Sequence, residues 1–429
     1  MEKQAIAEGY KQTEFGIIPE EWSVKNVGEV LKITTGSKNT QDRVDDGKYP
    51  FFVRSQKVEQ INTYSFEGEG VLTAGDGVGT GKIFHYINGK CDIHQRVYLM
   101  YDFADELDAF YFFKFFSNNF YDRISSMTAK SSVDSVRKEM ISDMRIVLPP
   151  LSEQTAIANA FSDVDALIAE LEKLIAKKQA IKTATMQQLL TGRTRLPEFA
   201  NHPDGTPKGY KQTELGEIPE DWEVVAISEL SRNIIDYRGR TPKKLGMDWG
   251  GGNIVALSAG NVKKGYIDFN AECYLGSIEL YRRWMTSGEP EQGDIAFTME
   301  APLGNVALIP DNAKYIMSQR TILIQVNKAK FDSGFIFQLF MSESFSRLIS
   351  DSATGSTAQG IKRTVFEKID VTVPQLLDEQ TAIANILSDM DEEIQSLQQL
   401  LDKTRQIKQG MMQELLTGKT RLVKPEDAA

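Results

Sequence analysis

Apolar residues recur at alternating spacings of four and three in two long stretches of the chain. This spacing predicts coiled-coil helices, because it places the apolar side chains along one face. The two predicted seams are Ile157, Phe161, Val164, Ile168, Leu171 and Ile175, and Ile383, Leu387, Met390, Ile394, Leu397 and Leu401. Both runs continue through Ile181 or Ile407 to a Leu-Leu-Thr-Gly sequence, whose glycine is a helix stop signal. Ser152 and Asp378, each directly before a Glu-Gln pair, mark the expected helix starts.

The two predicted helices need a partner, since an isolated helix would leave its apolar seam in water. Some 38 residues at 1.5 Å each give about 58 Å of helix. Residues 154–196 and 380–422 are identical at 24 of 43 positions, so the chain supplies two helices of equal length and register. We therefore expect them to pair side by side and antiparallel. The alternative is that each helix folds back on its own half of the chain.

A second, shorter repeat precedes each variable stretch. Residues 9–30 return as residues 209–230 with 13 of 22 positions identical, whereas the inserts at 31–150 and 231–375 are unlike each other. Between the first helix and the second short repeat, residues 192–208 contain three prolines and are typical of a linker. The chain thus duplicates the short repeat and the long helix, which together we call the frame, and varies the inserts between them. This organisation suggests a scaffold with two different recognition modules.

The inserts nevertheless share an order of patterns. Each contains a segment with strand-like alternation, then an amphipathic helical segment, then a polar loop that leads into a short helix and strand. The corresponding segments are 92–100 and 316–324, 113–125 and 338–350, and 134–149 and 359–374. We therefore predict an α+β protein with two mixed α/β domains and a pair of long antiparallel helices as a coiled-coil spacer. The two halves are related by a pseudo-two-fold repeat.

The pattern predicts six segments along the chain. They are a first recognition domain at 1–150, a first spacer helix at 151–191, a linker at 192–208, a second recognition domain at 209–375, a second spacer helix at 376–417 and a tail at 418–429.

The distribution of charge refines this picture. The net charge is −11, which at first argues against nucleic acid as a partner. The inserts carry 15 and 17 Lys or Arg against 16 and 15 Asp or Glu, so they are nearly neutral and the excess acid lies in the frame. A phosphate backbone would be repelled by the frame but not by clustered cations on the inserts. Only two cysteines, Cys91 and Cys273, occur, which fits a reducing cytoplasm.

Candidate DNA contacts lie in the polar loops of the inserts. Their side chains can pair with guanine or adenine edges or bind phosphates, although ordinary solvated loops have a similar composition. In the first insert the candidates are Ser37, Lys38, Arg43, Arg54, Gln56, Lys57, Lys82, Gln95, Arg96 and Arg137. In the second they are Tyr237, Arg238, Arg240, Thr241, Lys243, Asn261, Lys263, Gln319, Arg320, Ser356, Thr357, Gln359, Lys362 and Arg363.

The sequence contains little that indicates catalysis. The glycine-rich stretch 74–82 resembles a phosphate-binding loop, but Asp76 replaces the first glycine and Ile83 the magnesium-binding hydroxyl, so a hairpin is the better prediction. His85, His94 and His202 lack ligand spacing, and no Asn-Pro-Pro-aromatic tetrapeptide of amino-directed DNA methyltransferases occurs. We expect a non-enzyme with no bound metal and no membrane-spanning segment.

The repeated motifs resemble those of a known family. EQTAIAN with its heptad run and MQxLLTGxTRL, together with GYKQTExGxIPExW before each insert, are similar to the specificity subunits of type I restriction–modification systems. The resemblance covers essentially the whole chain. It implies that each insert is a target-recognition domain that reads one half of a bipartite, asymmetric site in double-stranded DNA. It also implies that the helices set the gap between the halves.

The resemblance further implies the partners and cofactors. Two modification subunits, which carry S-adenosylmethionine and methylate adenine, would dock on this chain. Restriction subunits, which use ATP and magnesium, would join them. This chain itself would bind no cofactor. Two alternatives are a single-chain DNA methyltransferase or nuclease with built-in specificity, and a coiled-coil scaffold that does not bind DNA.

Overall fold

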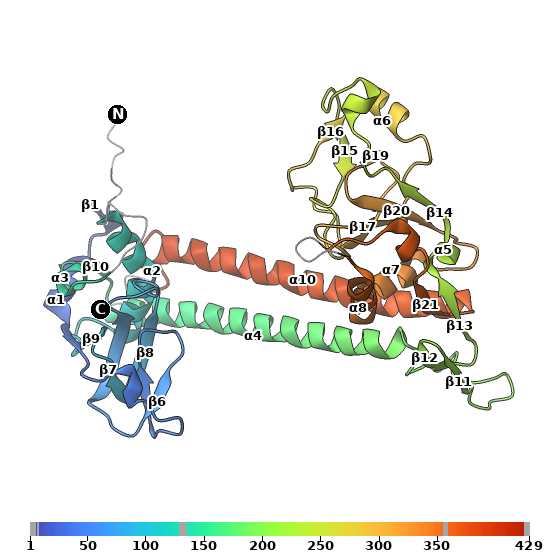
Figure 1. Cartoon of the computed structure of the whole chain (residues 1–429). Helices are drawn as coiled ribbons and strands as arrows, with labels where there is room; N and C mark the ends of the chain where they lie inside the picture. The colour runs from blue at the N-terminus through green and yellow to red at the C-terminus, as the bar shows by residue number, and fades with distance from the viewer. Residues whose placement is uncertain (1–5, 7, 128–134, 355–358, 424–429) are drawn as a thin grey trace. The chain divides into compact units, whose positions relative to one another are not determined.

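In the computed structural model the chain forms two compact units, residues 1–172 with 399–429, and residues 173–398. The structure describes residues 6, 8–127, 135–354 and 359–423. Each unit combines one lobe of strands and short helices with the adjoining halves of two long helices (Figure 1). We call residues 8–150 the first lobe and residues 209–375 the second lobe.

The long helices are α4 (Leu151–Leu189) and α10 (Leu377–Leu415), each of 39 residues. Both helices end close to the glycines that were predicted to stop them. Gly192 and Gly418 adopt φ values of 69° and 68°, the left-handed conformation that glycine tolerates. Each helix begins one residue before the start signal at Ser152 or Asp378. Ser152 and Asp378 therefore lie in the first turn and do not precede it.

Ion pairs within each unit show that α4 and α10 run antiparallel, as Figure 1 also shows. The pairs are Asp165–Lys408 and Glu172–Arg405 in the first unit, both at 2.6 Å, and Lys178–Glu393 at 2.6 Å and Lys182–Asp391 in the second. In each unit the position on α10 falls as the position on α4 rises. The predicted antiparallel pairing is confirmed.

The predicted seam is buried along both helices, with one correction. All twelve seam residues are buried or half-buried, but Ile181 and Ile407 are 43% and 49% exposed. Each follows the last seam residue, Ile175 or Leu401, by six positions, which is about 240° around a helix of 3.6 residues per turn. Lys182, seven positions after Ile175, returns to the seam and is buried. The continuation through the two isoleucines was therefore wrong.

The ends of the long helices also belong to the cores of the lobes. Ile157 and Phe161 near the start of α4 join the core of the first lobe, together with Leu415 and Leu416 at the end of α10. The second lobe takes up the equivalent residues, Leu189 and Leu190 from α4 and Ile383 and Leu387 from α10. Pairing between the helices and packing on the lobes thus both occur, at different points along each helix.

The first lobe is built on one six-stranded sheet, in the order β4-β9-β7-β8-β5-β6. Its elements are β1 (Tyr10–Thr13), β2 (Gly16–Pro19), β3 (Ser23–Asn26), α1 (Val27–Val30), β4 (Lys32–Thr35), the 3-10 helix η1 (Thr40–Asp42), β5 (Tyr49–Phe52), β6 (Glu59–Ile61), β7 (Phe66–Ala74), β8 (Phe84–Ile93), β9 (Val97–Tyr101), α2 (Ala109–Ser126), α3 (Lys138–Ser142) and β10 (Arg145–Leu148). Helix α2 packs on the sheet through aromatic contacts, such as Phe116 with Phe84 of β8. The antiparallel pairing of β7 with β8 confirms the hairpin predicted around the glycine-rich stretch.

The second lobe repeats this plan with a divided sheet. Its larger sheets are β14-β20-β17-β18 and β16-β15-β19, and β11-β12 and β13-β21 form two separate pairs. The elements are β11 (Tyr210–Thr213), β12 (Gly216–Pro219), β13 (Trp222–Ala226), α5 (Ile227–Leu230), β14 (Ser231–Asp236), the 3-10 helix η2 (Pro242–Leu245), β15 (Ile254–Leu257), β16 (Leu275–Gly276), α6 (Ile278–Trp284), β17 (Ile295–Thr298), β18 (Val306–Leu308), β19 (Tyr315–Met317), β20 (Thr321–Val326), α7 (Ser333–Met341), α8 (Glu343–Ser352), α9 (Arg363–Phe366) and β21 (Asp370–Pro374).

Two local expectations needed correction. The segments 92–100 and 316–324 are not single strands, because tight turns at residues 94–96 and 318–320 separate β8 from β9 and β19 from β20. The second helical segment, 338–350, is divided at Ser342, whose extended backbone (φ −67°, ψ 152°) ends α7 while its hydroxyl accepts from Phe345 N at 3.2 Å to cap α8.

A pair of arginines joins the short repeats to the helices. In the first unit Arg421, just after α10, donates two hydrogen bonds to Glu153 of α4 at 2.6 and 2.7 Å, and its guanidinium lies over the Trp22 ring. In the second unit Arg195 makes the same contacts with Glu379 and Trp222. Each short repeat therefore packs where one long helix begins and the other ends.

Candidate nucleic-acid interface

In the first lobe, backbone hydrogen bonds gather the candidate loops at one end of the sheet. The turn at residues 94–96 is the centre of this arrangement. Its backbone is tied to the ends of β4, β5 and β7 by three bonds, Gln95 N to Lys38 O (2.8 Å), His94 N to Phe52 O (3.0 Å) and Gly75 N to Arg96 O (2.8 Å). A fourth bond, Val136 N to Gly75 O at 2.7 Å, adds the loop that carries Arg137. Candidates from five separate parts of the sequence thus meet on one surface.

The second lobe builds the equivalent surface with equivalent bonds. Ser318 N donates to Leu257 O at 2.8 Å, Met299 N to Arg320 O at 2.8 Å and Ile361 N to Met299 O at 3.1 Å. These bonds bring the candidates after β15, in the turn at 318–320 and before α9 to one end of the sheets. The side chains that they present differ from those of the first lobe, as the divergent inserts predicted.

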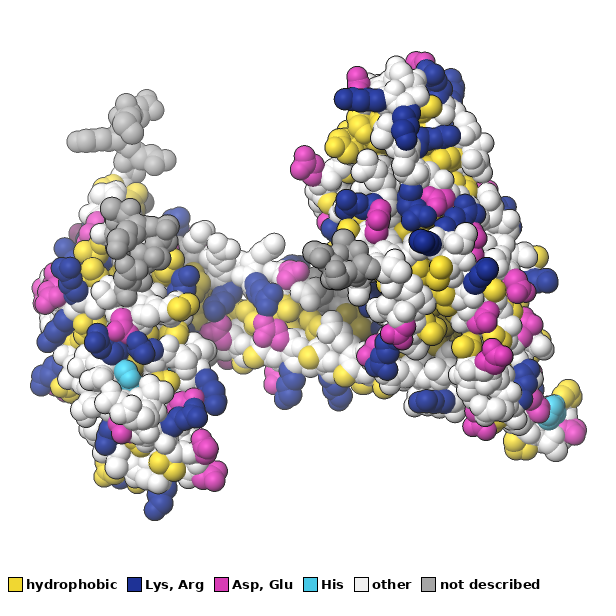
Figure 2. Space-filling model, in the orientation of Figure 1, with side chains coloured by type: hydrophobic (Ala, Val, Ile, Leu, Met, Phe, Trp, Pro, Cys, Tyr) yellow, Lys and Arg dark blue, Asp and Glu magenta, His cyan; other side chains and the backbone are white. Residues whose placement is uncertain are grey.

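Most candidate side chains are accessible. Those exposed to solvent are Ser37, Arg43, Arg54, Gln56, Lys57, Lys82, Gln95, Arg96, Arg137, Lys243, Gln319, Arg320, Gln359 and Lys362. Those half-buried are Lys38, Arg238, Arg240, Thr241, Lys263 and Arg363. Ser356 and Thr357 lie outside the described residues. Figure 2 shows Lys and Arg side chains interspersed with Asp and Glu on the visible faces of both lobes. A role in binding DNA stays a prediction for each of these residues.

Tyr237 and Asn261 do not fit the role predicted for them. Tyr237 is 4% exposed, and its hydroxyl accepts a hydrogen bond from Ser287 N at 2.6 Å. Asn261 is fully buried, and its amide group accepts from Ser258 N at 2.8 Å and donates to Ala256 O at 3.1 Å. Side chains that are buried and already hydrogen-bonded within the lobe are not accessible to a base. Both residues shape the loops from within.

Several accessible arginines are fixed by carboxylates. Arg238 donates to Asp236 through Nε at 2.9 Å and Nη2 at 2.7 Å, so its guanidinium is held in one orientation. Burial would raise the pKa of Asp236, but its hydrogen bonds with Arg238 outweigh burial and hold the pKa below the usual range. The pair is therefore charged at neutral pH. An arginine fixed in this way loses little conformational freedom when it binds a partner.

The choice of candidates by residue type left out two carboxylates at the centre of these surfaces. Asp76 follows β7 and Glu300 follows β17, and each lies beside the backbone bonds described above, as bridges from Asp76 to Ser135 and from Glu300 to Gly360 show. Neither was a candidate, since acidic side chains are repelled by phosphates. The signal that could have found them is the spacing between the halves, because Asp76 and Glu300 are separated by 224 residues, as are Arg96 and Arg320.

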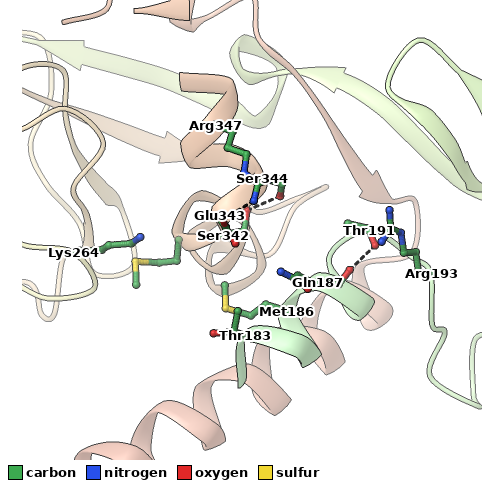
Figure 3. A pocket seen from close by; sticks show the side chains of 11 residues that line it. Thr183, Met186, Gln187, Thr191, Arg193, Lys264, Ser342, Glu343, Ser344 and Arg347 are labelled. Carbon is green, nitrogen blue, oxygen red and sulfur yellow. Dashed lines mark hydrogen bonds and ion pairs between the residues drawn. The ribbon is translucent and has the colours of Figure 1, made fainter. Parts of the chain in front are cut away.

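A hollow of about 490 Å³ opens elsewhere in the second unit, between the end of α4 and the start of α8 (Figure 3). Several of its polar groups bind one another. Ser342 and Ser344 share a hydrogen bond at 3.0 Å, the Thr191 hydroxyl donates to Gln187 O at 2.6 Å, and Glu343 pairs with Arg347. These pairings are typical of a packing gap between elements, and we assign no chemistry to the hollow.

Two further features bear on function. Among the described residues, no three His, Cys, Asp or Glu side chains are grouped so that they could hold a metal ion. Within the same residues, no helix combines the length and the apolar character needed to cross a membrane.

Comparison with known proteins places this architecture in a family. The model of the type I restriction modification DNA specificity domain matches the chain twice, at residues 19–183 and 219–406. The MjaVIII type I specificity subunit of Methanocaldococcus jannaschii is 28% identical over 97% of this chain and 96% of its own length. The EcoDI specificity subunit of Escherichia coli is 24% identical over 86% of this chain and 82% of its own.

A solved structure agrees in fold. The S subunit of a type I restriction–modification system from M. genitalium covers 92% of this chain and 96% of its own, with a TM-score of 0.60 and 13% identity. The family predicted from the repeated motifs is thereby confirmed, as is the α+β fold with its two repeated domains and long helices. The chain belongs to the type I restriction modification DNA specificity family, and it carries two copies of the family's domain.

Proposed function

We propose that each lobe reads one half of a bipartite site in double-stranded DNA. The observation that carries this proposal is the pair of equivalent loop surfaces, which the same backbone bonds assemble from different side chains. Two readers with one fold and unlike contact residues would recognise unlike sequences. The target is therefore asymmetric, with two specified halves and an unspecified gap.

The long helices take two roles in this proposal. They set the gap, since recognition requires both halves to face their readers on a helix that turns about 34° per base pair. They also dock two modification subunits. In support, Leu167, Leu174 and Ile181 recur every seven residues along α4 and are 38–49% exposed, which gives the helix a partly exposed apolar stripe.

We infer the remaining components from the family resemblance. The modification subunits supply S-adenosylmethionine and methylate adenine within the site, and restriction subunits supply ATP- and magnesium-dependent cleavage. This chain acts in the cytoplasm as a recognition and assembly subunit without catalysis or cofactor. The acidic excess of the frame suits contact with protein partners better than contact with phosphates.

Methylome sequencing of cells with and without the gene tests the proposal. Deletion should erase one gapped, non-palindromic adenine-methylation motif and leave other motifs unchanged. Retention of every motif would contradict the proposed function. Incubation of the purified chain alone with S-adenosylmethionine and the motif duplex distinguishes the single-chain enzyme, because methyl transfer without modification subunits would contradict a non-catalytic role.

A further inference from the structure

Asp76 places a negative charge on a surface that we propose binds negatively charged DNA. It follows β7, on the loop surface that carries the exposed Arg54 and Arg96, and its side chain is 21% exposed. A carboxylate there repels phosphates and lowers the affinity for any DNA. A contribution of Asp76 to sequence recognition would offset this loss of affinity.

The two oxygens of Asp76 bind two arginines. Oδ1 accepts from Arg54 Nη1 at 2.7 Å and Oδ2 accepts from Arg96 Nη1 at 3.1 Å. The two arginine side chains are 45% and 64% exposed. Their Nε and Nη2 groups make no side-chain hydrogen bond to the described residues. A guanidinium held by one nitrogen can still donate two parallel hydrogen bonds from its remaining edge, the geometry that matches O6 and N7 of guanine.

The backbone beneath these arginines is fixed as well. Arg96 N donates to His94 Nδ1 at 3.0 Å, and His94 is 4% exposed. Burial, reinforced by the nearby charge of Arg54, lowers the pKa of His94, so the imidazole stays neutral and can accept this bond. The turn that carries Arg96 therefore holds its shape while the guanidinium points to solvent.

Glu300 occupies the equivalent position in the second lobe, but its surroundings differ. It lies in a hollow of about 490 Å³ lined also by Arg238, Lys362 and Arg363, and it is exposed. The arginine at the position of Arg54 is absent, since the equivalent residue after β15 is Ala259. Arg238, which is anchored by Asp236, comes from the end of β14 instead. The two lobes thus share the place of the carboxylate and differ in the cations around it.

Building on the proposed function, we propose that Asp76 is the anchor of a base-reading cluster in the first lobe. Asp76 is a positioning residue, because it holds Arg54 and Arg96 so that their free edges read guanine in the first half-site. In the second lobe Arg238 and Arg363 are instead held by Asp236 and Glu367, so Glu300 anchors neither of these arginines. The common fold fixes the position of the carboxylate in both lobes, and the cations on each surface determine which bases are read.

The test uses Asp76→Asn and Glu300→Gln, which remove the charge and keep the size. Each variant is assembled with its modification subunits, and its affinity is measured by fluorescence anisotropy. The probes are a duplex with the motif found by methylome sequencing, duplexes with each base pair of one half-site replaced, and a duplex without the motif. We expect Asp76→Asn to lose about tenfold of its discrimination at guanines of the first half-site, the scale of one bidentate contact, and to keep discrimination in the second half-site. Glu300→Gln removes a carboxylate that holds neither Arg238 nor Arg363, so it is the matched control and should keep discrimination in both half-sites.

Binding to the duplex without the motif separates positioning from repulsion and from misfolding. Removal of one negative charge should leave this binding unchanged or strengthen it, since phosphates dominate unspecific affinity. Asp76→Glu, which restores the charge, should recover most of the lost discrimination. Wild-type discrimination in Asp76→Asn, or an equal loss on all duplexes, would overturn the proposal. Failure of the wild-type complex to prefer any motif would instead contradict the proposed function itself.

Discussion

Arg421 and Arg195 show how single residues hold the repeated frame together. Each binds a glutamate at the start of a long helix, and that glutamate is almost completely buried, at 0% for Glu153 and 1% for Glu379. A buried carboxylate without its partner keeps the cost of leaving water and loses the compensating charge. Arg195 and Arg421, which lie in the two copies of the Thr-Arg-Leu sequence, are therefore required where each short repeat packs against the long helices.

Substitution of Arg421 tests this requirement. Arg421→Gln should lower the free energy of unfolding by about 3 kcal/mol, since it strands a buried charge. Urea denaturation followed by circular dichroism measures the change. Arg405→Gln is the matched control, because Arg405 and Glu172 are each 51% exposed and such a pair contributes less than about 1 kcal/mol. Equal effects of the two substitutions would show that burial of Glu153 is not what makes Arg421 important.

The candidate surface was only partly predictable from single residues. Exposed arginines such as Arg54 and Arg96 follow from loop composition, because polar, positively charged loops are where DNA-binding proteins place their contacts. The burial of Tyr237 and Asn261 does not follow, since their types and loop positions match those of the exposed candidates. The relevance of Asp76 depends on which loops the fold brings together, and the sequence around Asp76 does not indicate this.

The long helices were the most predictable elements. Their seam repeats over many turns, so that one misplaced residue such as Ile181 changes little, and their glycine ends have one favoured backbone conformation. The boundaries of shorter elements were harder to predict. The turn at 94–96 lies within a continuous run of strand-like residues, and the division at Ser342 differs from the unbroken α2 of the first lobe despite similar sequences.

Seam and stripe residues of α4 can be distinguished by mutation. Leu171 of the seam is 6% exposed, whereas Leu167, one turn earlier, is 49% exposed. Leu171→Ala should lower the free energy of unfolding by about 2–3 kcal/mol because it leaves a cavity, and Leu167→Ala should change it by less than about 0.5 kcal/mol. Thermal and urea denaturation measure both.

The same two variants also separate packing from docking. If the exposed stripe binds modification subunits, Leu167→Ala should weaken their association, measured by analytical ultracentrifugation of the mixed subunits. Undiminished assembly of Leu167→Ala would remove the stripe from the docking surface, whatever the effect on stability.

At the scale of the whole molecule, the frame holds each lobe through main-chain atoms. In the first unit the side chain of Gln154 donates to Pro149 O and Glu106 O, both at 2.8 Å, and accepts from Asp108 N at 2.9 Å. In the second unit Gln380 makes the same three contacts with Pro374 O, Lys330 O and Asp332 N. Bonds to the backbone do not depend on the side chains of the insert. The repeated helix can therefore accept inserts of different sequence.

The end of each insert is joined to the frame in the same manner. Strand β13 of the second short repeat pairs with β21, the last strand of the second insert, from Trp222 opposite Pro374 to Ala226 opposite Asp370. Strands β3 and β10 form the equivalent ladder in the first unit. Because both junctions are ladders of backbone hydrogen bonds, replacement of residues 231–375 by the insert of a relative should preserve the fold.

Such a replacement should change one half of the methylated motif and leave the other half and the gap as they were. The frame, both long helices and the first lobe stay identical, so nothing that reads the first half or spaces the two halves has been altered. Methylome sequencing of cells that carry only the chimaera measures the outcome. A matched chimaera with Gln380→Ala, which removes the three backbone contacts, should fold less stably and methylate fewer sites without reading a different sequence. A change in both halves of the motif would mean that the lobes do not read independently, and the duplicated frame would then need a different explanation.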